Sequence, residues 1–159
     1  MLHKSESKLI ESLRLLDPKC RIEERQHQKE IHYRNGAWLL KQSKFHTKPR
    51  EEWFFGIGEG YVQNFGNGCW KGVVLLCRDH KKTKEDEPLF TVHLASEEVV
   101  RRIKLGIAYP KGRYGFEYKV NVTHNGIECR VEVEGAGPPI TASWVSWQET
   151  AGSLDEFLG

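Results

Sequence analysis

The residues with the clearest catalytic potential are Glu117 and Lys119, which are separated by one residue. On a strand of a metal-dependent nuclease, a carboxylate and a lysine at this spacing act on one metal ion and its attacking water. Asp79 or Asp86 would have to supply the second ligand. A tripeptide this short matches often by chance, and the hairpin described below places Lys119 opposite Glu132 on an exposed face. We therefore expect no catalytic residue and keep the nuclease as an alternative.

The sequence offers no other catalytic or metal-binding pattern. Its four cysteines, at positions 20, 69, 77 and 129, include no CxxC pair and have no histidine pair at zinc-ligand spacing. Cys77 and Cys129 fall at apolar strand positions, which predicts buried thiols. We expect neither a metal nor a cofactor.

The element that carries Glu117 and Lys119 is predicted to be a β-hairpin. Asn125-Gly126 is the strongest short signal for a two-residue turn, because both turn positions of type I′ need positive φ. Folding about it pairs Val122 with Cys129, Val120 with Val131 and Tyr118 with Val133, and on the other face Asn121 with Arg130 and Lys119 with Glu132. The apolar face of this hairpin must lie against a core.

The remaining elements predict a mainly β fold. A second Asn-Gly turn, at residues 35 and 36, indicates another hairpin, and residues 72–77 read as a strand buried on both faces. Further expected elements are helices at 5–16 and 96–105, strands at 53–57, 89–94 and 142–147, and a polar tail or linker at 148–159. We expect one domain, residues 1–147, built as a small antiparallel open β-barrel of about seven strands with two short helices.

Basic residues gather in two segments that contain no acid. Residues 31–50 and 99–113 each hold five lysines and arginines, whereas residues 128–159 hold six acids and one arginine. Such asymmetry favours a polyanionic partner, although one basic run is often only a solvated face. The predicted phosphate contacts are Lys41, Lys44, Lys48, Arg50, Arg101, Arg102, Lys111 and Arg113, and the predicted base-edge readers are Arg34, Asn35 and His46.

Four aromatic residues stand at strand ends or in glycine-rich loops, some near these basic runs: Trp53, Tyr61, Trp70 and Tyr114. Aromatic rings beside cations stack on unpaired or flipped bases. The alternative is that they pack the loops onto the core.

The order of these elements resembles a known class of domain. The chain contains, in order, an aromatic strand WFFGI, an apolar strand VVLLC, a charged loop, a strand LFTVHL, a short helix and the hairpin YGFEYKVNV…GIECRV. In this order it is similar to the B3-like and PUA-like barrels, including EVE and YTH domains, that are attached to restriction enzymes. The resemblance covers about residues 30 to 135. A B3-like domain implies two arms in the major groove, and a PUA-like domain implies a pocket for a flipped, modified base.

The expected function is therefore that of a non-catalytic specificity module of a restriction system. We expect it to bind double-stranded DNA at a specific or methylated site and to work with a nuclease or NTPase domain. The alternatives are an RNA-binding PUA-like module, a metal-dependent nuclease using Glu117 and Lys119, and a protein-interaction domain. The start of the chain lacks a signal-peptide pattern and no apolar run is long enough for a membrane span, so we expect a cytoplasmic protein.

Overall fold

The computed structural model describes residues 2–25, 28–46, 52–61, 69–78, 88–111, 115–125 and 127–158. Strands predominate, which confirms the predicted mainly β class. The elements in chain order are α1 (Lys4–Leu13), β1 (Arg21–Arg25), β2 (Gln28–Tyr33), β3 (Gly36–His46), β4 (Glu52–Gly58), β5 (Gly72–Arg78), β6 (Pro88–Ala95), α3 (Ser96–Ile103), β7 (Tyr109–Pro110), β8 (Phe116–His124), β9 (Cys129–Val133), β10 (Ile140–Ala142), β11 (Trp144–Ser146), the 3₁₀ turn η2 (Trp147–Glu149) and α4 (Thr150–Leu158).

The strands form a mixed sheet that is largely antiparallel, as expected, with one parallel pair. Its order is β10-β9-β8-β4-β3-β5-β6-β11, with β1 and β2 joined to β3 and with β7 joined to β8. β3 and β5 run parallel, and the other pairs are antiparallel. β10 and β11 stand at opposite ends of this order although only Ser143 separates them, so this stretch of chain pairs with both β9 and β6.

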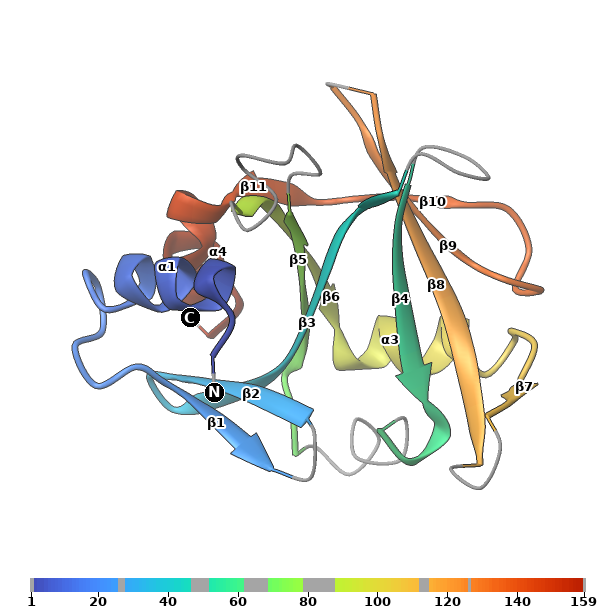
Figure 1. Cartoon of the computed structure of the whole chain (residues 1–159), viewed down its shortest axis with the longest axis horizontal. Helices are drawn as coiled ribbons and strands as arrows, with labels where there is room; N and C mark the ends of the chain where they lie inside the picture. Colours follow the sequence, from blue (N-terminus) through green and yellow to red (C-terminus); the bar gives the residue numbers. More distant parts are fainter. Residues whose placement is uncertain are drawn as a thin grey trace.

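The long strand β3 joins two groups of strands. One group contains β1, β2, β5, β6 and β11, and the other contains β4, β7, β8, β9 and β10. β3 pairs with β2 and β5 along most of its length, but with β4 only at Phe45 and His46. β4 instead follows β8 from Trp53 to Gly58. β3 and β4 therefore meet at one end and diverge toward the other, and α3 lies across the wider end between the two groups (Figure 1).

Two apolar cores lie on opposite faces of β5. Val73, Leu75 and Cys77 belong to the core between the two groups of strands, and Val74 and Leu76 belong to a second core on the outer side. The prediction that this strand is buried on both faces is thus confirmed. The inner core is completed by β4, β6, β8, β9 and α3, and the outer one by α1, α4 and β2.

The segment 148–159 differs from the polar tail that the sequence suggested. Thr150–Leu158 is the helix α4, and its Ala151 and Leu154 are buried in the outer core. A salt bridge from Asp155 to Arg34 and a hydrogen bond between the hydroxyls of Thr150 and Thr91 hold the helix in place. Two buried residues were too few to give the segment a visible apolar period, so only tertiary contacts define it.

The predicted hairpin forms, but its register is shifted by two residues. Val120 pairs with Val133, Asn121 with Glu132 and Val122 with Val131, and a four-residue loop from position 125 to 128 replaces the Asn-Gly turn. The Asn125 side chain accepts hydrogen bonds from the backbone N–H groups of residues 127 and 128, which stabilises the longer loop. A two-residue shift keeps each side chain on its face, so the predicted apolar face is buried as expected.

The other hairpin turn is also displaced by one residue. Tyr33 pairs with Gly36, so Arg34 and Asn35 form the turn, and Arg34 adopts a left-handed backbone with φ 51°. Its N–H donates to Asp17 Oδ2 at 2.7 Å. This bond, together with the salt bridge to Asp155, fixes an unfavourable conformation that glycine or asparagine would adopt more easily.

Candidate nucleic-acid interface

Lys41 occupies the place where β3 and β4 diverge. It alternates with Leu39 of the inner core and pairs with Leu75 of β5, so it lies on the inner face of the sheet. Its Nζ is 4.8 Å from the centroid of the Tyr61 ring, which in turn packs edge-on against Trp70. Burial lowers the pKa of Lys41, the charge of Lys111 lowers it further, and Glu117 opposes this. The site therefore contains a partly desolvated ammonium group against an aromatic ring.

A second pair of charges borders this lysine from the β8 side. Lys111 Nζ donates to Glu117 Oε1 at 3.0 Å. Glu117 is opposite Gly58 on β4, and its carboxylate occupies the space that a Cβ atom at Gly56 would need. The absence of a side chain at Gly56 thus leaves room for this carboxylate beside β4.

Lys119 and Tyr109 add another cation and ring at the same end of β8. Lys119 Nζ is 4.3 Å from the Tyr109 ring centroid. The Tyr109 hydroxyl donates to Glu134 Oε2 at 2.7 Å, and this hydrogen bond raises the pKa of Tyr109. We call Lys41, Tyr61, Tyr109, Lys111, Glu117 and Lys119 together the lysine–tyrosine cluster.

In the described part of the chain, the two acid-free segments approach each other where Lys111 comes near Lys41, and their other described cations lie farther apart. β3 carries Lys44 and His46 to the end where it meets β4, whereas Lys111 lies beside the opposite end of β4, where Gly58 faces Glu117. Seven residues of strand separate these ends, which is about 20 Å. Among the described cations of the predicted set, Lys41 and Lys111 are the pair that brings the two segments together. Lys48, Arg50, Arg113 and Tyr114, and the side chains of Lys44 and His46, lie outside the described part of the chain.

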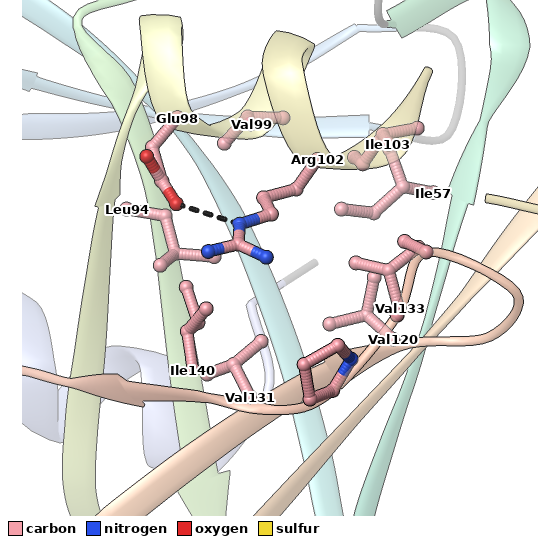
Figure 2. A pocket seen from close by; sticks show the side chains of 13 residues that line it. Ile57, Leu94, Glu98, Val99, Arg102, Ile103, Val120, Val131, Val133 and Ile140 are labelled. Carbon is pink, nitrogen blue, oxygen red and sulfur yellow. Dashed lines mark hydrogen bonds and ion pairs between the residues drawn. The ribbon is translucent and has the colours of Figure 1, made fainter. Parts of the chain in front are cut away.

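An acid just outside one acid-free run pairs with two of the predicted phosphate contacts. Arg101 and Arg102 both donate to Glu98, at 2.6 and 3.1 Å, and the bond from Arg101 is the main cause that lowers the pKa of Glu98. Arg102 extends over an apolar pocket (Figure 2). A sequence run without acids therefore did not produce a surface without acids.

Arg34 and Asn35 border an open polar hollow of about 390 Å³ at the β2–β3 turn, which also contains Arg21, His32 and Lys71. Arg34 Nε is bound to Asp155 and its backbone to Asp17, so the guanidinium holds the fold together. Asn35 is exposed, and its role as a base reader stays a prediction.

Two of the four predicted stacking residues are core residues, which corrects their assignment. Trp53 and Trp70 are only 6% and 3% exposed. Trp53 Nε1 donates to the backbone oxygen of Arg78 at 2.8 Å, and Trp70 Nε1 donates to Glu30 Oε2 at 3.0 Å. A tryptophan ring buries a large apolar area, and it can lie in the core when its N–H group has a hydrogen-bond acceptor. Tyr61 is half-buried and keeps its place beside Lys41.

The nuclease alternative receives no support from the geometry of Glu117. Its carboxylate is bound to Lys111, and the residues that the structure describes contain no group of three His, Cys, Asp or Glu side chains able to hold a metal ion. Asp79 and Asp86 lie outside those residues. Cys77 and Cys129 are buried free thiols, as predicted, and burial raises the pKa of Cys129 to about 12.

Sequence reasoning missed a buried network around His93 of β6. His93 Nε2 lies 3.1 Å from Thr91 Oγ1, and its Nδ1 lies 3.0 Å from Ser153 Oγ of α4. Burial lowers the pKa of His93 to about 4. The alternation of Thr91 and His93 with the buried Phe90 and Val92 indicated a strand face, but no signal pointed to the helix that covers it.

In the described part of the chain, no helix has the length and apolar character needed to cross a membrane. Comparisons of the chain with protein-family models, with curated proteins and with solved structures find no match.

Proposed function

We propose that this chain is a DNA-binding specificity module of a restriction system and that it contacts DNA through the lysine–tyrosine cluster. The observation that supports this most directly is the Lys41 ammonium group over the Tyr61 ring, with Lys111 nearby, where β3 and β4 diverge. Recognition of an exposed or flipped base needs two components: cations that bind phosphates, and an aromatic ring that stacks on the base.

The ion pairs now formed by these lysines do not prevent them from binding phosphate. The Lys111 side chain is 59% exposed, and an exposed ion pair contributes at most about 1 kcal/mol. Lys111 can therefore exchange Glu117 for a phosphate at little cost. Lys41 is more buried and loses less hydration when a phosphate approaches it, so each contact it makes is stronger.

In this proposal the two groups of strands form the open barrel that the resemblance to B3-like and PUA-like domains implies. The ligand is a specific or methylated duplex site, and Arg113 and Tyr114, which follow Lys111 in the sequence, extend the contact. Cleavage belongs to a nuclease or NTPase domain of the same system.

Fluorescence anisotropy with matched unmodified, 5-methylcytosine and N6-methyladenine duplexes at several salt concentrations tests this function. We expect Lys41→Met combined with Lys111→Gln to weaken binding to every duplex and to reduce the salt slope by about one unit for each lost phosphate contact. Tyr61→Leu should reduce any preference for a modified duplex. Lys19→Gln, which changes an exposed lysine in the turn after α1, is the matched control and should bind as the wild type does.

Other outcomes would replace the proposal. Equal affinity and salt slope in the double variant and in the control would remove the cluster from the interface. Tighter binding to single-stranded or structured RNA would identify the RNA-binding alternative. Mg²⁺-dependent cleavage that Glu117→Ala abolishes would establish the nuclease, and the absence of any polyanion affinity would leave a protein-interaction domain.

A further inference from the structure

An apolar pocket lies between α3 and the strands of the inner core. Its walls include Val99 and Ile103 from α3, Val120 from β8, Val131 from β9 and Ile140 from β10. The pocket has a volume of about 410 Å³ when the open space at its mouth is counted. The part that a water-sized molecule can enter is much smaller, about 20 Å³. The space left free holds about one water molecule, so an organic ligand enters only if a lining side chain moves outward.

Arg102 is the side chain that crosses this pocket. Figure 2 shows it extending from α3 into the space between the helix and the strands that carry Val131 and Ile140. Its Nε donates to Glu98 Oε1 at 3.1 Å. Among the residues that the structure describes, none accepts a hydrogen bond from its two terminal NH₂ groups. These groups are thus available to an acceptor inside the pocket.

The charges around the pocket leave one positive charge unbalanced. Glu98 and Arg102 are the charged residues that line it. Glu98 also accepts a hydrogen bond from Arg101 at 2.6 Å, so one carboxylate serves two guanidinium groups. A ligand with one negative charge would balance the group.

The chemistry of the lining defines the class of ligand. A guanidinium group binds a carboxylate through two parallel hydrogen bonds, and an apolar setting strengthens that interaction. The valine and isoleucine walls select for an apolar group attached to the carboxylate. The assignment of Arg102 to the DNA backbone stays a prediction, since its side chain is 28% exposed.

We propose that this pocket binds a small organic monocarboxylate with a branched aliphatic or an aromatic group, and that Arg102 binds its carboxylate. This goes beyond the proposed DNA binding and does not depend on it, because the pocket shares no residue with the lysine–tyrosine cluster.

Methyl-group NMR of the whole chain, titrated with 4-methylpentanoate and with benzoate, tests the proposal. We expect saturable shifts of the methyl signals of Val99, Val131 and Ile140, and much weaker binding of the neutral 4-methylpentanamide. Arg102→Gln should weaken carboxylate binding at least about tenfold. Lys104→Gln changes an exposed lysine just after α3 that does not line the pocket, so it is the matched control and should leave affinity within about twofold.

Glu98→Gln separates ligand binding from a merely structural role of the arginine. Removal of the competing carboxylate should tighten monocarboxylate binding, although it breaks the same salt bridge as Arg102→Gln does. Equal binding of the amide and the acid, unchanged affinity in Arg102→Gln, or no saturable shift with either probe would each overturn the proposal. The methyl spectra of the free variants show whether each one is folded.

Discussion

The buried His93 should make the stability of the fold fall as the pH falls. Its side chain is 6% exposed, and burial lowers its pKa from 6.5 to about 4. Both ring nitrogens lie near hydroxyl groups, which can accept hydrogen bonds from either protonation state. The cost of protonation is therefore the burial of a charge between β6 and α4, and not the loss of a hydrogen bond.

The sign and size of this effect follow from linkage between protonation and folding. Because the pKa is lower in the folded state, the stabilisation is complete above pH 6.5 and is lost as the pH falls toward 4. The whole shift corresponds to about 3 kcal/mol, and about 2 kcal/mol of it is lost between about pH 7.5 and about pH 5.

Urea denaturation of the wild type and of His93→Gln at these two pH values measures it. Glutamine retains a donor and an acceptor but does not titrate, and contributions from all other groups cancel in the comparison. We expect the wild type to lose about 2 kcal/mol more than the variant does on acidification. Equal losses in the two proteins, or an imidazole NMR signal of His93 that titrates near pH 6.5, would refute the reasoning.

Three further substitutions test the packing. Leu154→Ala in α4 should reduce the free energy of unfolding by about 2–4 kcal/mol, because Leu154 is fully buried; an unchanged urea midpoint would mean that α4 is not docked. Gly72→Ala would force a Cβ atom into the backbone oxygen of Leu94 on the neighbouring strand. We therefore expect the free energy of unfolding to fall by more than about 3 kcal/mol, or the variant not to fold. A wild-type melting temperature would contradict this. Gly56→Ala displaces only the flexible carboxylate of Glu117, so it should lower the free energy of unfolding by about 1 kcal/mol. In a double-mutant cycle, Gly56→Ala should cause no such loss once Glu117→Ala is present. Additive effects would show that the two residues do not meet.

Much of the fold could be read from local patterns. The apolar run at residues 72–77 predicted a strand buried on both faces, and the alternation from Phe116 to Val133 predicted a hairpin with one buried face. These patterns are readable because burial acts on each side chain according to its position in a periodic element. They do not depend on which other element supplies the covering surface.

The sequence was a poor guide to the site, because the site depends on contacts between distant segments. Asp155 pairs with Arg34 from 121 residues away, so the acid-free run around Arg34 does not give an acid-free surface. Trp53 and Trp70 looked like loop aromatics, yet each finds a polar partner at least 25 residues away in the chain and packs into the core.

By itself, the sequence determined the class of secondary structure, the faces of the strands that are buried and the positions of the main turns to within two residues. Only the tertiary structure decided the register of the main hairpin, the helix at residues 150–158 and the divergence of β3 from β4. The physical reason is that sequence periodicity reports whether a residue is buried. Strand pairing, the neutralisation of charges and the set of cations that come together in a site depend instead on which surfaces meet.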